Sequence, residues 1–191
     1  MTPRFEDVAV GQRIGPLLKG PLTTAHLMRW SAAMENWHRI HYDRSFAVEH
    51  DGLPDLLING SLKQQFVTQL LKDWAGTEGW LWKLSFQFRA MNRVGETLQV
   101  WGCVRSKQQA GAYGLVTVET GVLNELGVES TPGTAVVALP LRGGPPVPYP
   151  FTAPVLRPVT APPRPRRRRL RGPLRFSSTP LSGSTPLLDL W

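Results

Sequence analysis

The sequence predicts an α+β protein in which two amphipathic helices precede an antiparallel series of strands. Apolar residues recur at helical spacing over 23–34 and 60–75, and the spacing changes to alternation from Trp80 onward. Helices followed by a run of strands are typical of folds in which one sheet packs against a helix. A chain of 191 residues is long enough for one such domain with a hydrophobic core of its own.

The first helix is expected over 23–34, where Thr23 and Thr24 are candidate N-caps. The second helix is expected to start at Gly60 and Ser61 and to stop at Gly76, because glycine accepts the left-handed backbone that ends many helices. Two adjacent apolar rows give it a wide buried face. These rows are Leu62, Phe66 and Leu70, and Val67, Leu71 and Trp74.

The strand signals begin at Trp80, where apolar and polar residues alternate over 80–90. This alternation predicts one apolar face, made of Trp82, Leu84, Phe86, Phe88 and Ala90. Further strands are expected at about 97–104, 114–123 and 134–141, separated by turn-prone pieces at 93–95 and 124–127.

Positive charge and proline are concentrated at the C-terminal end. Eight arginines and one acid, Asp189, lie from Phe151 onward, so this end supplies +7 of the net charge of +8. Twelve of the eighteen prolines lie at or after Pro145. Such a segment has few backbone donors and little apolar surface. We therefore expect a folded domain over 1–141 and a disordered Pro/Arg-rich tail over 142–191.

The rest of the composition is that of an ordinary globular domain. Residues 1–150 carry fourteen basic and thirteen acidic side chains. A single cysteine, Cys103, excludes an intrachain disulfide framework and a thiolate-rich metal site, which fits a reducing cytoplasmic location. No apolar run has the length of a membrane span, and Glu6 and Asp7 stand where a signal peptide is apolar.

The arginine-rich tail has two other interpretations. It could contact nucleic acid or an anionic surface by charge alone, but the run 164–171 lacks the interleaved aromatic residues of single-strand binders. A GC-rich extension of a reading frame would have the same Pro, Arg, Ser and Leu content. The sequence favours neither membrane nor nucleic acid as a partner of the folded domain.

The densest polar cluster lies directly after the first predicted helix, in Glu35-Asn-Trp-His-Arg-Ile-His-Tyr-Asp43. A histidine titrates near neutral pH and can give or take a proton, while a polar neighbour can hold a water for attack. His38 and His41 are therefore candidate acid/base residues. Each residue also has a structural interpretation, since a lone histidine is more often a packing residue and Asp43 can cap a short helix over 46–49.

A second candidate element leads into the long helix as Asn59-Gly60-Ser61. Glycine lets a ligand carbonyl approach the backbone, and the free N–H groups and positive dipole at a helix start suit a developing oxyanion. Taken alone, the same three residues are an ordinary helix start.

The two elements together resemble the MaoC-like acyl-CoA dehydratase/hydratase family. Members have a helix that ends in a stretch of the form Gly-Asp-x-Asn-Pro-x-His-x-Asp, followed by a loop and a glycine-containing turn into a long helix. Here the corresponding residues are 35–43 and Asn59-Gly60. The version with Asn36 is similar to mesaconyl-CoA hydratase-like and 3-hydroxyacyl-thioester dehydratase-like members. The resemblance covers about residues 5–141.

The resemblance implies a hot-dog fold, in which a curved antiparallel sheet wraps a long central helix, and a homodimer. It implies addition of water to a 2-enoyl thioester, or removal of water from a 3-hydroxyacyl thioester, on CoA or a carrier protein and without a metal or other cofactor. In this interpretation His41 is the acid/base and the Gly60 N–H binds the thioester carbonyl. Ser61, Asn59 and Asp43 are then expected in substrate binding.

The chain departs from the family at the carboxylate five positions before the catalytic histidine, which is Asn36 here. An amide can orient a water but cannot accept its proton at neutral pH. We therefore expect His41 to be the principal acid/base, with Glu35 or His38 assisting. The same departure leaves open a non-catalytic subunit that binds acyl-CoA or supports a catalytic partner.

Overall fold

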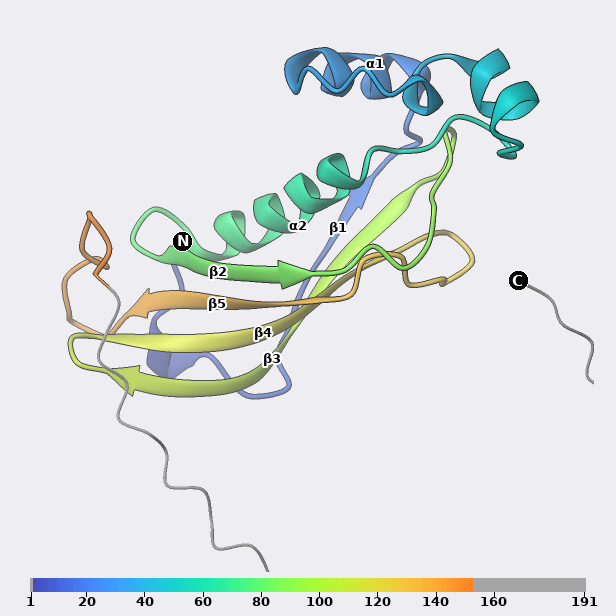
Figure 1. Ribbon diagram of the computed structural model, residues 1–191. Helices are drawn as coiled ribbons and strands as arrows, with labels where there is room; N and C mark the ends of the chain where they lie inside the picture. Colours follow the sequence, from blue (N-terminus) through green and yellow to red (C-terminus); the bar gives the residue numbers. More distant parts are fainter. Residues whose placement is uncertain (1, 153–191) are drawn as a thin grey trace, which may run out of the picture. The chain divides into compact units, whose positions relative to one another are not determined.

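In the computed structural model, which describes residues 2–152, a five-stranded antiparallel sheet curves around one long helix (Figure 1). The elements are η1 (Phe5–Asp7), β1 (Arg13–Lys19), α1 (Thr24–Ala33), η2 (Arg39–His41), η3 (Phe46–His50), α2 (Gly60–Ala75), β2 (Trp80–Phe86), β3 (Leu98–Ala110), β4 (Tyr113–Leu123) and β5 (Gly133–Pro140). The strand order is β1-β3-β4-β5-β2. The predicted α+β class, with a long helix wrapped by a curved sheet, is confirmed.

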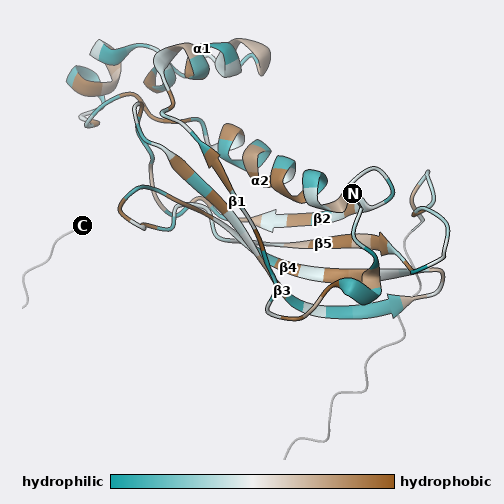
Figure 2. Ribbon diagram, turned by 180° about the vertical axis from the view of Figure 1, so that it is seen from behind, coloured by the Kyte–Doolittle hydropathy of each residue, from teal (hydrophilic) through white to brown (hydrophobic). Residues whose placement is uncertain are grey.

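The long helix α2 packs on the sheet through the apolar rows that its sequence predicted. Its Val67 and Leu71 are almost fully buried, in one core with strand residues such as Val100 and Val137. Burial of each such side chain contributes about 1.5–3 kcal/mol to folding. The apolar stretches of the strands lie under the helix, whereas the far end of β3 is hydrophilic (Figure 2).

The start of α1 and the end of α2 follow the predicted signals. Thr23 is the N-cap of α1, where its side chain bonds the backbone of His26 and the His26 ring bonds the Thr23 backbone in return. The helix α2 ends at Gly76 with a φ of 65°, a left-handed conformation that strains any residue with a Cβ.

The strand predicted over 80–90 ends at Phe86, and its side chains do not alternate regularly between the two faces of the sheet. A register shift between Leu81 and Lys83 puts Trp82 on the outer face of the sheet, while Leu84 packs into the main core. The prediction that Trp82 and Leu84 share one face is therefore wrong. A bulge of this kind adds an unpaired residue, which reverses the alternation that the sequence pattern assumes.

The edge strand β1 was not predicted from the sequence. Its Gly15-Pro16 pair interrupts the pattern, and its pairing with β3 is irregular between Ile14 and Leu17. Proline cannot donate to a ladder and is tolerated at a sheet edge, which is where β1 lies. The strand therefore depends on its partner β3 rather than on its own pattern.

The chain after β5 packs on the outer face of the sheet up to Thr152. The Phe151 ring lies beside Trp82 and Tyr113, with ring centroids 5.5 and 5.7 Å away. The Tyr113 hydroxyl donates to the Thr152 carbonyl at 2.8 Å, and the Val147 N–H donates to the Glu78 carbonyl at 2.8 Å. From residue 153 onward, the predicted disorder of the tail lies outside the described residues.

Within residues 2–152, no helix has the length and apolar character needed to cross a membrane.

Candidate active site

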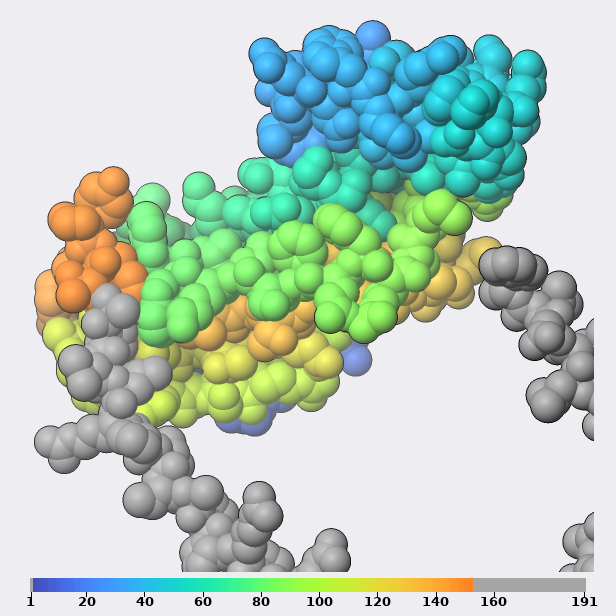
Figure 3. All heavy atoms as spheres, viewed as in Figure 1, coloured from blue at the N-terminus to red at the C-terminus, as the bar shows by residue number. Residues whose placement is uncertain are grey.

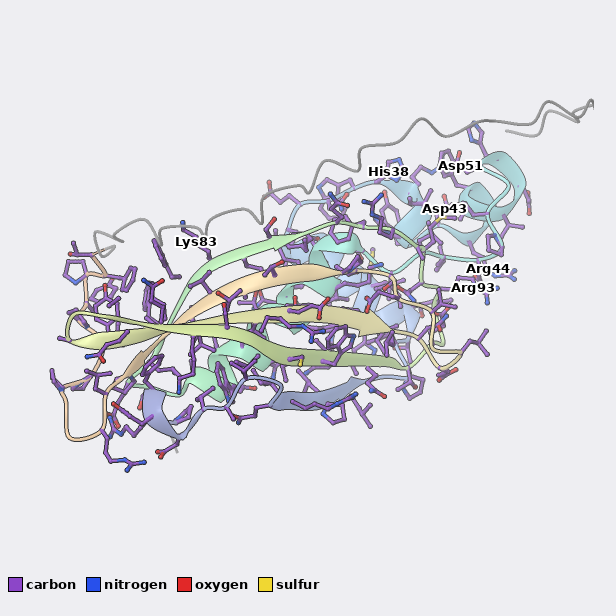
Figure 4. The ribbon with its side chains drawn as sticks, turned by 90° about the horizontal axis from the view of Figure 1, so that it is seen from below. His38, Asp43, Arg44, Asp51, Lys83 and Arg93 are labelled. Carbon is purple, nitrogen blue, oxygen red and sulfur yellow. The ribbon has the colours of Figure 1, made fainter. Side chains whose placement is uncertain are left out.

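The predicted site residues lie in an excursion of the chain between α1 and α2. After α1 the chain passes through η2 and η3 and returns through residues 56–58 to the start of α2, so that the excursion lies over the N-terminal end of that helix (Figure 1). His38 and Asp43 lie in this excursion, far from Lys83 on β2 (Figure 4).

Backbone hydrogen bonds hold the excursion against the start of α2. The Leu57 N–H donates to the Ile40 carbonyl at 3.0 Å, and the Ile58 N–H donates to the Asn92 carbonyl at 2.8 Å. Residues 56–58 thus lie between η2 on one side and the loop after β2 on the other. This arrangement fixes η2 and the first residue of α2 in one unit.

His41 is anchored by its ring to the same segment. Its Nδ1 lies 2.8 Å from the Leu57 carbonyl oxygen, which can only accept a hydrogen bond, so Nδ1 carries a proton and Nε2 is the basic nitrogen of the neutral ring. Partial burial is the main cause that lowers the pKa of His41, and nearby His38 lowers it further, while the bond to Leu57 opposes both. His41 is therefore held mostly neutral at pH 7.

Gly60 provides a free donor at the positive end of α2. It is the first residue of this 16-residue helix, and none of the described residues accepts a hydrogen bond from its N–H. The Phe88 ring covers the glycine, since a Cβ built at Gly60 would lie 2.8 Å from that ring. The N–H and the helix dipole together suit an oxygen that gains negative charge.

Asn59 is fully buried and joins the two helices. Its Nδ2 donates to the Ser31 hydroxyl at 3.3 Å, and the Ser31 carbonyl accepts the Asn36 N–H at 2.9 Å. Its side chain does not cap α2, and its Oδ1 has no donor among the described residues. A buried oxygen without a donor costs about 1–3 kcal/mol.

Ser61 has a structural partner. Its hydroxyl oxygen accepts the Trp30 indole N–H at 2.8 Å, which ties α1 to the first turn of α2.

The candidates around His41 are not equally placed. The ring of His38 lies 6.0 Å from that of His41 between centroids, whereas among the described residues no hydrogen bond joins Glu35 to His41. Glu35 is exposed and has a φ of 49°, a left-handed backbone at the end of α1. Asn36 accepts the His38 N–H through Oδ1 at 3.3 Å, which leaves its NH2 group available as a donor.

Asp43 is engaged within the excursion. One carboxylate oxygen accepts the Phe46 N–H at 3.1 Å, and the other accepts Arg39 at 2.6 Å, a bond that is the main cause of the lowered pKa of Asp43. Asp43 therefore caps η3, as its alternative interpretation held. The Arg39 guanidinium also lies 4.2 Å from the centre of the Phe46 ring.

The sequence analysis missed Lys63, which is only 2% exposed in the first turns of α2. Its Nζ donates to the Ala90 carbonyl and to Asn92 Oδ1, each at 3.0 Å, and burial lowers its pKa to about 8. Because Asn92 also accepts the Ile58 N–H, Lys63 braces the loop that holds the site. A signal existed, since Lys63 stands one turn before Val67 in an otherwise apolar row.

The described residues contain no group of three or more His, Cys, Asp or Glu side chains arranged to hold a metal ion.

Several solved structures share this fold. The (R)-hydratase PhaJ1 from Pseudomonas aeruginosa, in its unliganded form, has a TM-score of 0.65 at 18% identity, over 73% of this chain and 86% of that chain. An (R)-hydratase from A. caviae involved in PHA biosynthesis has a TM-score of 0.63 at 23% identity, over 71% and 99%. A MaoC-like dehydratase from Rhodospirillum rubrum has a TM-score of 0.64 at 20% identity, over 73% and 98%. At these identities the likeness establishes the fold, which is the hot-dog fold that the resemblance implied.

The sequence comparison is more specific. No curated protein matches the chain. Residues 18–96, which contain α1, the excursion and α2, match the family described as hydroxyacyl-thioester dehydratase type 2. This family match over residues 18–96 and the shared fold confirm the resemblance to MaoC-like hydratases and dehydratases that was drawn from residues 35–43 and 59–60.

Proposed function

We propose that this protein hydrates 2-enoyl thioesters, and dehydrates 3-hydroxyacyl thioesters in reverse, with His41 as the acid/base. The hydrogen bond between His41 Nδ1 and the Leu57 carbonyl carries the proposal. This bond leaves Nε2 as an available base. It also anchors the His41 ring to residues 56–58, which lead directly into Gly60. A base and an oxyanion donor are the two groups that this reaction requires.

In hydration, His41 Nε2 accepts a proton from water while the water oxygen bonds to Cβ of the enoyl group. The electron pair of the double bond moves toward the thioester, so that negative charge develops on the carbonyl oxygen. The Gly60 N–H and the positive end of α2 stabilise that charge. The proton on Nε2 then passes to Cα, which completes the addition of one water. Dehydration follows the same steps in reverse.

Asn36 has a positioning role in this proposal. Its NH2 group can donate to the attacking water, but an amide cannot take the water proton at neutral pH. Both proton transfers therefore fall to His41. The lowered pKa of His41 supports this assignment, because a neutral imidazole is the form that accepts a proton.

The alternative is a non-catalytic subunit that binds an acyl thioester or supports a catalytic partner. The observation that favours it is the Asn36 amide in the position of the family carboxylate, with its oxygen bonded to the His38 backbone. Such a protein would keep the Gly60 donor and the fold without a complete set of proton acceptors.

An assay with crotonyl-CoA and longer 2-enoyl-CoA substrates separates the two functions. We expect turnover by the wild-type protein and a decrease in kcat of about 10²- to 10⁴-fold in His41→Ala, the usual range for a lost general acid/base. The matched control is His50→Ala, because His50 is exposed on η3 and bonds only its neighbour Asp51 there. Wild-type protein that binds enoyl-CoA without turnover would support the non-catalytic alternative, and an active His41→Ala would remove His41 from the mechanism.

We also propose a cytoplasmic homodimer that needs no metal or redox cofactor. Apolar side chains are exposed at the two ends of the edge strand β2, with Trp80 at 38% at its start and Phe88 at 52% and Met91 at 63% in the loop after it. An exposed sheet edge with apolar side chains can pair with a second copy of the chain. Nucleic-acid binding by the arginine-rich tail is a lesser alternative, and it lies outside the described residues.

A further inference from the structure

A cavity of about 460 Å³ lies on a part of the sheet that the proposed reaction does not use. It is lined by Gly11, Arg13, Gln99, Trp101, Gly102, Cys103, Arg105 and Leu123. None of these residues belongs to α1, to the excursion or to α2, which contain the candidate active site. The volume falls in the range of small-molecule sites.

The cavity lies on the outer face of the sheet, opposite α2. Along β3, Leu98, Val100 and Val104 are fully buried in the core that α2 covers. Successive side chains of a strand point to opposite faces, so Trp101 and Cys103 lie on the outer face. In Figure 3, α1 and the excursion form the top of the molecule, whereas β3 and β4 form its lower side.

Trp101 gives the cavity an aromatic wall that is held in place. Its indole N–H donates to Glu129 Oε2 at 3.0 Å. On the neighbouring strand Trp101 pairs with Gly121, and a Cβ built at Gly121 would lie 2.6 Å from the indole nitrogen. The ring therefore lies against the glycine of β4 and is fixed there by Glu129. A partly exposed ring in a fixed orientation can stack with a flat ligand.

Two arginines give the cavity its charge. Arg13 stands opposite Cys103 across β1 and β3, and Arg105 follows Cys103 by two positions, so both arginines lie close together on one face. Arg105 pairs with Glu119, whereas Arg13 forms no ion pair within residues 2–152. None of the residues that line the cavity is acidic. The lining is therefore complementary to an anion.

We propose that this cavity binds a mononucleotide, with the base stacked on Trp101 and the phosphate held by Arg13 and Arg105. A flat base matches the indole wall, and stacking on an aromatic side chain accepts any base. A phosphate offers several oxygens, which two guanidinium groups can share through charge-assisted hydrogen bonds. The site is independent of the proposed function, because none of its residues takes part in the hydration chemistry.

Cys103 makes the test direct. It lines the cavity, is partly exposed and is the only cysteine of the chain. The rate at which iodoacetamide alkylates the full-length protein, measured by mass spectrometry, therefore reports occupancy of this cavity. Nucleotide bound to the arginine-rich tail leaves that rate unchanged.

The ligands for this assay are adenosine 5′-monophosphate (AMP), adenosine, ribose 5-phosphate and benzoate. We expect AMP to protect Cys103 at concentrations about tenfold lower than adenosine or ribose 5-phosphate, because each of these lacks one of the two recognised groups. Benzoate, an aromatic anion without phosphate, should protect no better than adenosine. Failure of AMP to slow alkylation, or equal protection by any of the other three ligands, would overturn the proposal.

Variants of the two recognition groups separate their roles. Arg13→Gln should weaken protection by AMP about tenfold and leave protection by adenosine unchanged, whereas Arg13→Lys keeps the charge and should retain most of the effect. Trp101→Leu should weaken protection by both ligands, and Trp101→Phe should retain part of it. The alkylation rate of each variant without ligand is its own reference.

Arg89→Gln is the matched control, because Arg89 is exposed and, like Arg13, has no ion pair in the described part of the chain. Protection by AMP that is the same in Arg13→Gln as in Arg89→Gln would remove the phosphate contact and overturn the site. The variant His41→Ala should be protected like the wild type. The result therefore stands or fails separately from hydratase turnover.

Discussion

The ring of His41 bonds the carbonyl of Leu57, a residue that stands three positions before Gly60. A single hydrogen bond of 2.8 Å therefore joins the candidate base to the segment that carries the candidate oxyanion donor. The Leu57 N–H also donates to the carbonyl of Ile40, the residue before His41, so Leu57 is bonded to η2 through both its N–H and its carbonyl. These two hydrogen bonds hold the two halves of the site together.

The variant Asn36→Asp tests whether the protein is an active hydratase that works without the family carboxylate or a non-catalytic binding subunit. Asparagine and aspartate are nearly isosteric, so the change adds a proton acceptor without repacking. We expect little gain in kcat, because a new negative charge near His41 raises its pKa and favours the protonated ring. Steady-state rates with crotonyl-CoA measure the effect. A large gain from a wild type without turnover would instead indicate a binding subunit that had lost its base.

The pH profile of hydration should report the lowered pKa of His41. Because the neutral ring is the base, kcat/KM should rise with pH and reach half of its plateau at the pKa of His41, which lies below 6.5. The variant His38→Gln removes a neighbour that lowers this pKa, so the acidic limb should move to higher pH. Glu49→Gln, on η3, is a suitable control. An unchanged limb in His38→Gln would show that the two histidines are not coupled.

The same pKa shift has a consequence for stability. The folded state disfavours protonated His41, so its contribution is fully present above the unfolded pKa of about 6.5 and is lost as the pH falls through the folded value. In His41→Gln this part of the acid destabilisation should be absent. Urea unfolding between pH 5 and pH 7 measures the difference, and parallel curves for variant and wild type would contradict the shift.

Gly60→Ala should impair both folding and activity, because the added methyl group would lie 2.8 Å from atoms of the Phe88 ring. The backbone N–H itself remains. The double variant Gly60→Ala/Phe88→Ala should therefore regain a large part of the activity. Phe88→Ala alone should change the activity little, because the wild-type glycine does not clash with the ring. Activity and thermal melts of the three variants provide the test. A double variant as impaired as Gly60→Ala would show that the ring is not the obstacle.

Lys63→Met should change how stability depends on pH. Because burial lowers the pKa of Lys63 from 10.5 to about 8, stability should increase as pH rises through this interval and should be lower below pH 8. The methionine variant should lack this rise, and it should also loosen the loop at Asn92 that Lys63 braces. Chemical unfolding at pH 7 and pH 10 checks both, with exposed Lys72→Met as the control. If the stability of Lys63→Met rose by the same amount between pH 7 and pH 10, other titratable groups would be its cause.

Two truncations should differ sharply in stability. A chain that stops after Thr152 keeps Phe151 on the outer face of the sheet and should melt like the full-length protein. A chain that stops after Leu141 exposes Trp82 and Tyr113 and should lose about 2 kcal/mol or more, the contribution of one buried aromatic side chain. Any retention of nucleic acid should disappear with the tail in both. Equal melting temperatures would show that the contacts of Phe151 contribute little.

The sequence by itself determined the elements that depend on local periodicity. The apolar rows and the bounding glycines predicted α2 from Gly60 to Gly76, and the polar cluster over 35–43 indicated where chemistry would be sought. These features are readable because a helix repeats its own contacts every three to four residues, so that a short window contains the whole signal. The resemblance to the family rested on such short windows too.

Tertiary structure alone decided how those elements meet. The bond from His41 to Leu57 spans 16 positions, and that from Lys63 to Asn92 spans 29, so neither has a local pattern to reveal it. The edge strand β1 exists through its pairing with β3, and the bulge before Lys83 reverses the face of Trp82. In each case the free energy comes from a contact between distant segments, and local periodicity contains no information about which distant residue supplies it.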